Sequence, residues 1–212
     1  MTASGLKLSM ADIGGKLYTF CSCMPLDRMS MDDRYPQLTL SPIEFEHNVR
    51  SMLDAMGHSL LGYTSEHREK IKGVDGEYEI DVSARFEFLG MEFLVLVECK
   101  HYKNSVKRET LQALYDKMRS VGAQKCALFS TSGFQSGALE YAKVHKIARV
   151  KVVDGWSAYF TRSMSTELIE PPPWAHLPLV SGWLIDGNQR AIVSEDHGEF
   201  LERFLFYGAA TE

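Results

Sequence analysis

Two acids and a lysine in the middle of the chain have types and spacing that could bind a metal ion. Glu98 and Lys100 flank Cys99 at the end of an apolar run. Because residues two apart in a strand share a face, Glu98 and Lys100 are expected to project together, with Cys99 on the opposite side. A hairpin turn near Leu89-Gly90-Met91 would place the preceding segment, which carries Asp81, alongside Glu98.

The chemistry expected of this group is hydrolysis of a phosphodiester bond. Two carboxylates held close together repel each other unless one takes a proton or a cation lies between them. Hard oxygen ligands suit Mg²⁺ or Mn²⁺, and a lysine beside such a cation could orient water or stabilise charge on a phosphate. Two alternatives stay open: Asp81 could be an ordinary polar residue on an exposed strand face, and Lys100 could neutralise Glu98 as an ion pair.

The elements that would position these residues are read from hydrophobic periodicity. Ser41 to Glu44 form a capping box with proline at the first helical position, which predicts a helix from Pro42 to Met56. Clean alternation predicts a strand from Tyr78 to Phe88, and the continuous apolar run Phe93 to Val97 is typical of a central strand buried on both faces. Between the helix and these strands, a short apolar segment at Ser59 to Tyr63 precedes a charged loop from Ser65 to Asp75.

Further along, the pattern predicts a helix from about Val106 to Val121, a strand Lys125 to Ser130, a helix Phe134 to His145 and a strand Ala148 to Val153. This order of elements predicts an α/β fold, a mixed central sheet flanked by helices.

These residues resemble a known family of nucleases. An acid, a hairpin and then Glu-x-Lys is similar to the PD-(D/E)XK superfamily, and the surrounding residues resemble the Mrr-type restriction endonuclease catalytic domain. The resemblance covers roughly residues 41 to 156. It rests on features that occur in the family's order: Pro42-Ile43-Glu44-Phe45-Glu46, Gly76 to Asp81, Glu98-Cys99-Lys100-His101-Tyr102, Phe134 through Ala142, and Val152-Val153-Asp154-Gly155.

The resemblance implies a restriction-endonuclease-like core and a Mg²⁺- or Mn²⁺-dependent endodeoxyribonuclease. Asp81, Glu98 and the backbone carbonyl of Cys99 would hold the metal, and Lys100 would position the attacking water. Glu46 would be an outer acid that supports the metal shell. DNA is the expected partner, and because a duplex cut needs two such sites, a homodimer or a pairing on DNA is expected.

Several of these residues also have ordinary structural interpretations. Glu46 could form an i, i+4 pair with Arg50, worth about 0.2–0.5 kcal/mol. Gln112, early in the next helix, lies where related nucleases often have a glutamine near the site, but it could be a surface residue. The side chain of Cys99 is expected to be a small buried hydrophobe.

Composition fits a globular enzyme. The 212 residues are 45% apolar and 24% charged, and no apolar run reaches the length of a membrane span. No secretory h-region is recognised at the start, so a cytoplasmic location with no membrane association is expected. Four cysteines match no zinc spacing and no disulfide framework, which indicates reduced thiols.

The net charge of −5 argues against a protein that coats DNA through bulk electrostatics. Local charge differs, because Lys100, Lys103, Lys107 and Arg108 follow one another with no acid between them. These residues could form a phosphate-facing rim or a solvated loop. His101 and Tyr102, within this segment, could contact a phosphate or be exposed to solvent.

The expected organisation is an N-terminal extension at 1–40, a nuclease-like core at 41–160 and a C-terminal extension or small subdomain at 161–212. The N-terminal part contains a possible strand at Leu17 to Cys21. The C-terminal part begins with a stiff break at Pro171-Pro172-Pro173, followed by a hairpin within Gly182 to Val193 and a short amphipathic helix at Glu199 to Phe206.

Two rival functions remain. The first is a non-catalytic nucleic-acid-binding or assembly module that retains the nuclease fold, favoured by the acidic net charge and by the lack of a recognisable winged-helix DNA reader. The second is a nuclease with the same chemistry that acts on branched or single-stranded DNA.

Overall fold

The computed structural model describes residues 8–13, 16–21, 38–155, 177–186 and 189–207. The helices are α1 (Pro42–Gly57), α2 (Arg108–Val121), α3 (Ser136–His145) and α5 (Glu199–Tyr207). The strands are β1 (Leu8–Ile13), β2 (Lys16–Cys21), β3 (Thr64–Lys72), β4 (Glu77–Phe88), β5 (Met91–Lys100), β6 (Lys125–Ser130), β7 (Ala148–Asp154), β8 (Val180–Asp186) and β9 (Gln189–Val193).

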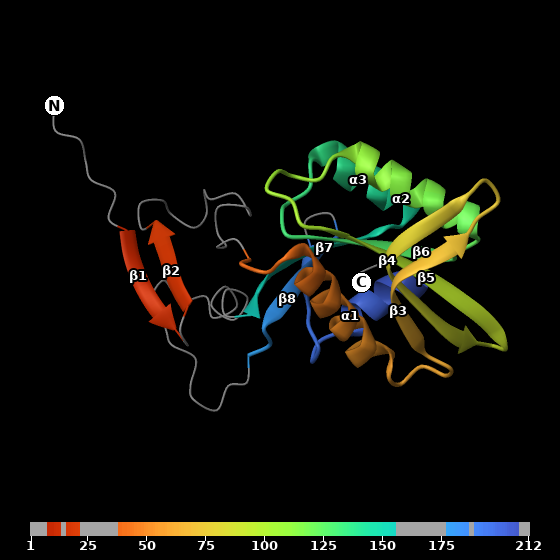
Figure 1. Ribbon diagram of the computed structural model, residues 1–212, viewed down its shortest axis with the longest axis horizontal. Helices are drawn as coiled ribbons and strands as arrows, with labels where there is room; N and C mark the ends of the chain where they lie inside the picture. Colours follow the sequence, from red (N-terminus) through yellow and green to blue (C-terminus); the bar gives the residue numbers. More distant parts are fainter. Residues whose placement is uncertain (1–7, 14–15, 22–37, 156–176, 187–188, 208–212) are drawn as a thin grey trace.

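A seven-stranded mixed sheet forms the centre of the fold, in the order β3-β4-β5-β6-β7-β8-β9. The pairs β5·β6 and β6·β7 are parallel, and the other neighbours in this sheet are antiparallel. Figure 1 shows α2 and α3 together on one face of the sheet and α1 on the other. The predicted α/β fold, a mixed sheet flanked by helices, is confirmed.

Two apolar clusters hold the layers together. One joins Phe45 and Val49 of α1 to the sheet and to Leu201 and Phe204 of α5. The other joins the opposite face of the sheet to α2 and α3, through residues such as Leu114 and Ala142. The sheet is therefore buried on both faces, as the continuous apolar run in β5 predicts.

The helix α1 begins where its capping box predicts. The Ser41 hydroxyl accepts from the Glu44 backbone N–H, and the Glu44 carboxylate accepts from the Ser41 N–H at 2.8 Å. This start fixes the direction in which Phe45 and Glu46 leave the first turn. Both are buried against the sheet.

The hairpin between β4 and β5 turns through Leu89 and Gly90, whose φ angles are 53° and 73°. Positive φ at both central residues is typical of the two-residue turn that matches strand twist. Phe88 pairs with Met91, and the register continues to Val82 opposite Val97. The pairing ends there, and at Asp81 the alternation of β4 breaks, because Ile80 packs on the α2 side of the sheet and Val82 on the α1 side.

The predicted loop at Ser65 to Asp75 is wrong, because Thr64–Lys72 forms the edge strand β3 against β4. The error has a physical cause: half-buried positions of β3 carry polar side chains where an amphipathic strand would carry apolar ones. Glu69, for example, receives two hydrogen bonds from Arg85 at 2.8 Å each. Charged residues on an edge strand also discourage pairing with other chains.

Other boundaries shift slightly: α2 begins at Arg108 rather than Val106, and α3 at Ser136 rather than Phe134.

Beyond residue 160, β8 and β9 continue the same sheet, and α5 packs on its core. At the other end, β2 pairs with β1 in a separate two-stranded sheet. Pro171-Pro172-Pro173 and the hairpin residues Gly187-Asn188 lie outside the described residues. Within the parts of the chain that the structure describes, no helix is long and apolar enough to cross a membrane.

Candidate active site

The carboxylate of Asp81 lies at the end of β5, beside Glu98. Its Oδ2 atom accepts a hydrogen bond from the backbone N–H of Cys99 at 2.7 Å. This contact crosses from β4 to β5, so the expectation that the hairpin brings Asp81 to the Glu-x-Lys segment agrees with the geometry.

The surroundings of Asp81 disfavour its charged form. Burial raises the pKa of Asp81 above its ordinary value, and the nearby Glu98 carboxylate raises it further. The Cys99 N–H and the Lys100 ammonium act in the opposite direction but do not outweigh these two effects. A cation between the two carboxylates would relieve this repulsion.

Glu98 is held by two ammonium groups. The Nζ atom of Lys100 is 2.6 Å from Oε1 of Glu98, and the Nζ atom of Lys117 is 3.1 Å from Oε2. Glu98 is only 8% exposed, so these partners offset the cost of burying its charge. The ion pair between Lys100 and Glu98 that the sequence leaves open is present.

Lys100 keeps its proton in this environment. Burial acts to lower the pKa of Lys100, but the Glu98 carboxylate outweighs it, so that the pKa lies above its ordinary value. A charged Lys100 can donate hydrogen bonds and stabilise negative charge.

Lys117 was not anticipated from the sequence. It lies in the middle of α2, three residues after the buried Leu114 and three before the buried Ser120. Residues three apart on a helix share a face, so a lysine at this position interrupts the stripe that packs on the sheet. That interruption is the signal that could have identified it.

Glu46 is hydrogen-bonded to two residues of β3 and also lies close enough to Asp81 to help raise the pKa of that carboxyl. Its carboxylate is 2.7 Å from Nε2 of His67 and 2.9 Å from Nε of Arg68. Burial acts to raise the pKa of Glu46, but the hydrogen bonds from Arg68 and His67 outweigh it and hold the pKa below its ordinary value. Arg50 instead contacts Asp54 and Ser65, so the proposed Glu46–Arg50 pair does not form.

Cys99 and Gln112 differ in their relation to the site. The Cys99 side chain is buried in the cluster that includes α1, and burial raises the pKa of its thiol well above the ordinary value. The N–H and C=O of one strand residue point to the same side, so the Cys99 carbonyl is directed toward β4 as its N–H is. Gln112 is exposed on α2, and no contact between it and the acids is found among the described residues.

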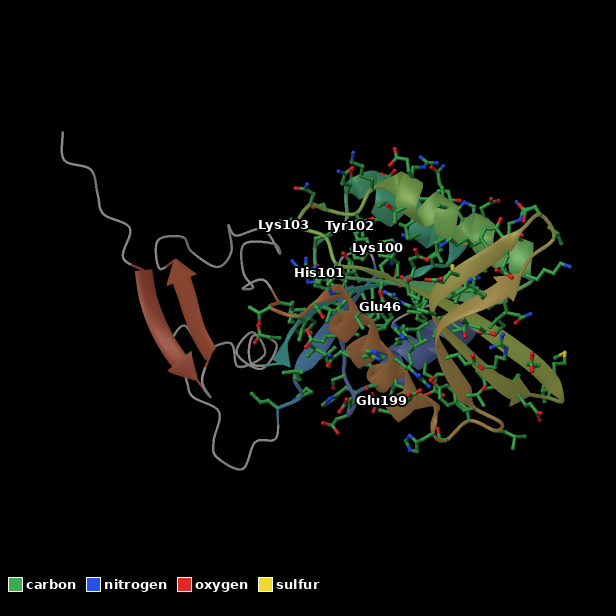
Figure 2. The ribbon with its side chains drawn as sticks, in the orientation of Figure 1. Glu46, Lys100, His101, Tyr102, Lys103 and Glu199 are labelled. Carbon is green, nitrogen blue, oxygen red and sulfur yellow. The ribbon has the colours of Figure 1, made fainter. Side chains whose placement is uncertain are left out.

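The basic segment leaves the site along the loop after β5. Figure 2 shows Lys100, His101, Tyr102 and Lys103 in succession, with Glu46 of α1 below them in this view. His101, Tyr102, Lys103, Lys107 and Arg108 are exposed. The loop is held by its backbone, since the Tyr102 carbonyl accepts from the Thr131 hydroxyl at 3.0 Å. The cations thus lie between the end of β5 and the first residue of α2.

The residues fit a hard divalent cation by their donor chemistry. In the ranges that the structure describes, no group of three or more His, Cys, Asp or Glu side chains is arranged to hold a metal ion. Asp81, Glu98 and the Cys99 carbonyl would supply three oxygen ligands, and Mg²⁺ commonly keeps several waters beside one or two carboxylates.

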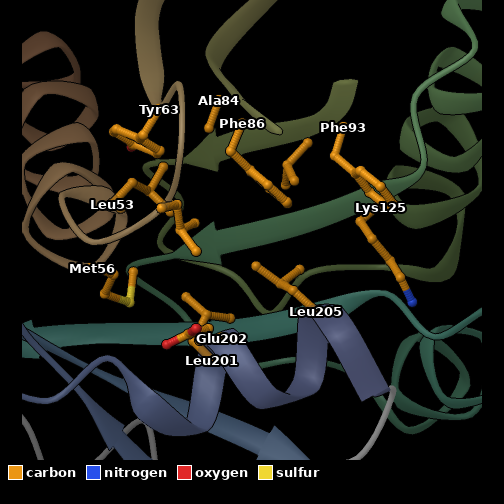
Figure 3. Close-up of a pocket in the computed structure, with 13 residues that line it drawn as sticks. Leu53, Met56, Tyr63, Ala84, Phe86, Phe93, Lys125, Leu201, Glu202 and Leu205 are labelled. Carbon is orange, nitrogen blue, oxygen red and sulfur yellow. The ribbon is translucent and has the colours of Figure 1, made fainter. Parts of the chain in front are cut away.

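A separate hollow lies between α1, α5 and the sheet, with a volume of about 90 Å³ (Figure 3). Its walls are mostly apolar, including Leu53, Phe86 and Leu201, with Lys125 and Glu202 at its margin. The acids of the candidate site do not line it. Its walls come from the same side chains that pack α5 on the core.

Comparison with known proteins assigns the family. The family Mrr_cat, described as restriction endonuclease, matches residues 38–157, which is more than half of the chain. The chain belongs to this restriction endonuclease family. The match contains Glu46, Asp81, Glu98 and Lys100 and extends from just before α1 to just after β7.

A curated relative is the type IV methyl-directed restriction enzyme EcoKMrr of Escherichia coli (strain K12). It is 32% identical over 120 residues, which are 56% of this chain and 36% of the relative. The chain thus matches about a third of the relative's length.

Two solved structures are distantly similar. The protein of unknown function AF1548 has a TM-score of 0.43 at 22% identity, covering 51% of this chain and 57% of its own. The DNA modification-dependent restriction endonuclease AspBHI has a TM-score of 0.35 at 16% identity, covering 62% and 36%. Similarity at this level carries no information on substrate or mechanism.

Proposed function

We propose that this chain is a divalent-metal-dependent endonuclease that hydrolyses phosphodiester bonds in DNA. The observation that carries the proposal is the contact between the Asp81 carboxylate and the Cys99 N–H. This contact brings Asp81 to the strand end that carries Glu98 and Lys100. The chain's family is described as restriction endonuclease. The relative from Escherichia coli is named as a restriction enzyme, which agrees with DNA as the substrate.

The roles of the residues follow from their charges and positions. Asp81, Glu98 and the Cys99 carbonyl would hold Mg²⁺ or Mn²⁺, which supplies Lewis-acid stabilisation of a water nucleophile and of charge on the scissile phosphate. Lys100, which stays protonated, would donate hydrogen bonds that orient the attacking water and stabilise the developing charge.

Glu46 and Gln112 have more distant roles in this proposal. Glu46 would support the metal shell from α1, and its hydrogen bonds to His67 and Arg68 fix its carboxylate in place. Gln112 would approach bound DNA only from the exposed side of α2, and we assign it no chemical step.

DNA would approach along the exposed basic loop after β5, where cations could pair with backbone phosphates. Cleavage of both strands requires two such sites, so we propose a homodimer or a pairing of two chains on DNA. The expected location is cytoplasmic.

A plasmid cleavage assay tests the proposal. Supercoiled plasmid, in methylated and unmethylated forms, is incubated with the full chain and Mg²⁺, Mn²⁺ or EDTA. Asp81→Asn, Glu98→Gln and Lys100→Ala should each abolish nicking, and Glu92→Gln, an exposed acid on the same strand β5, should not. Nicking that survives all three substitutions would come from another site or from a contaminant.

One observation favours a second function, a nucleic-acid-binding or assembly module without catalysis. Both oxygens of Glu98 already have ammonium partners, so the acid is satisfied by the protein itself. In that case DNA would bind without being cleaved under any metal condition, and Glu98→Gln would leave DNA affinity unchanged.

A further inference from the structure

Lys117 and a divalent cation would compete for the same atoms. Lys117 approaches Glu98 from α2, with Nζ 3.1 Å from Oε2 and 3.5 Å from Oε1. Glu98 is also an expected metal ligand, and each of its oxygens can serve a cation only from the directions that the lysines leave open. The position of Lys117 therefore bears directly on how the site accepts a metal.

The charges of the side chains around Glu98 also oppose metal binding. Two carboxylates, from Asp81 and Glu98, meet two ammonium groups, from Lys100 and Lys117, so the formal charges of these four side chains cancel. Glu46, the next acid, is balanced separately by Arg68. A divalent cation entering this group would meet two ammonium groups at close range, which costs free energy until further negative charge arrives.

A DNA phosphate would supply that negative charge. Of the two lysines, Lys117 is the one whose ammonium could move from Glu98 to the phosphate. Lys100 is two residues from Glu98 on the same strand and makes the shorter contact, at 2.6 Å. Lys117 reaches in from another element, makes the longer contact, and its side chain is 26% exposed. Its flexible four-carbon stem could move the ammonium from Glu98 to a phosphate oxygen without any change in the backbone.

We propose that Lys117 couples metal binding to DNA binding: its ammonium holds Glu98 against a divalent cation and releases it when a DNA phosphate draws the ammonium away. The inference rests on the proposed function, since it assumes that Glu98 is a metal ligand. Lys117 is in this account a positioning residue, because it acts on the metal through Glu98.

The test measures Mn²⁺ binding to the free protein by isothermal titration calorimetry, which needs no cleavage. Lys117→Met and Lys117→Gln remove the competing charge and should tighten Mn²⁺ binding about tenfold, as expected of one nearby like charge removed from a partly buried site. Lys117→Arg keeps the charge and should bind Mn²⁺ close to wild type. Arg119→Ala removes one positive charge from an exposed position of the same helix and should leave the affinity unchanged.

A second measurement tests the coupling itself. Affinity for a short DNA duplex is measured by fluorescence anisotropy with Ca²⁺ and with EDTA, and linkage requires that DNA and cation strengthen each other's binding by the same factor. That factor should be large in the wild type and smaller in Lys117→Met, because this variant accepts the cation without DNA.

The outcomes separate this inference from the proposed function. If Glu98→Gln abolishes Mn²⁺ binding while both neutral Lys117 variants, shown by circular dichroism to be folded, bind Mn²⁺ no more tightly than wild type, Lys117 does not compete and the inference is wrong. If Glu98→Gln itself leaves Mn²⁺ binding unchanged, the metal site and the proposed function fail together. Loss of Mn²⁺ binding in Lys117→Met would equally overturn the inference.

Discussion

The Asp81 carboxylate on β4 accepts a hydrogen bond from the Cys99 backbone N–H on β5. The contact joins the strand that carries the first acid to the strand that carries the second acid and the lysine. Burial and the neighbouring Glu98 carboxylate nevertheless raise the pKa of Asp81, and this hydrogen bond and the Lys100 ammonium only partly offset them.

Asp81→Asn separates the charge of this residue from its hydrogen bond. The amide oxygen can still accept from Cys99, so the thermal unfolding midpoint should stay near that of the wild type. Loss of the negative charge should reduce DNA cleavage by about 100-fold or more at fixed Mg²⁺, as expected when a group that stabilises the reacting centre is removed. Cleavage within tenfold of wild type would remove Asp81 from the catalytic group.

Glu46→Gln should change the pH dependence of stability. The pKa of folded Glu46 lies below its ordinary value of 4.5, so the unfolded chain binds this proton more tightly than the folded chain. The stabilisation from Glu46 is therefore complete above about pH 4.5 and is lost as the pH falls through the lower, folded pKa.

Urea unfolding of wild type and Glu46→Gln at a series of pH values measures this effect. Near neutral pH the variant should be less stable by about 1 kcal/mol, a small value because Arg68 is 45% exposed and its charge is screened. The two proteins should converge in strongly acidic solution. A constant difference at all pH values would show that packing, and not charge, gives Glu46 its effect.

Arg149→Met should destabilise the fold more than any change at the candidate site. Arg149 is 1% exposed on β7 and donates to the carbonyls of Ile185, at 2.9 Å from Nε, and Leu139, at 3.1 Å. The substitution leaves these two carbonyls without their donor and should cost about 2–6 kcal/mol, since each buried acceptor left unsatisfied costs about 1–3 kcal/mol. Arg190→Met, at an exposed position of β9, is the control and should change stability by less than about 0.5 kcal/mol. Equal effects at both positions would contradict the prediction.

Leu201→Ala tests whether α5 unfolds together with the sheet. Leu201 is fully buried against the α1 side of the core, and its loss should cost about 2–5 kcal/mol. Phe200→Ala, at a position 37% exposed, should cost much less. Chemical denaturation followed by tryptophan fluorescence and by circular dichroism should give one shared transition that moves to lower denaturant. An earlier, separate transition would show that α5 is only loosely attached.

Much of the fold could be predicted from the sequence where local signals agree with the final packing. The capping box at Ser41 fixes the start of α1, alternation identifies β4, and Leu89-Gly90 marks the turn. The strand β3 could not be predicted in this way. His67 and Glu69 are half-buried on it through ionic partners that lie elsewhere in the chain, and periodicity detects only apolar faces.

In the candidate site too, the residues placed by local signals could be predicted and those placed by tertiary packing could not. Asp81, Glu98 and Lys100 could be placed together because one short turn aligns β4 with β5, although the break in alternation at Asp81, between Ile80 and Val82, could not be predicted. Lys117 and the partners of Glu46 could not, because they reach the acids from a different helix and an edge strand through tertiary packing. The Glu46–Arg50 alternative failed for this reason: His67 and Arg68 of the edge strand occupy the Glu46 carboxylate.

The tight connection between β4 and β5 makes the acids sensitive to loop length. Side chains alternate between the two sides of a strand, so a single residue added at Leu89-Gly90 would either bulge outward or shift the pairing by one and turn one acid away from the other. Two added residues could be absorbed as a longer loop with the pairing kept. Insertions that the turn absorbs should therefore keep the two acids together, whereas a change that shifts the pairing of β4 and β5 by one residue should separate them.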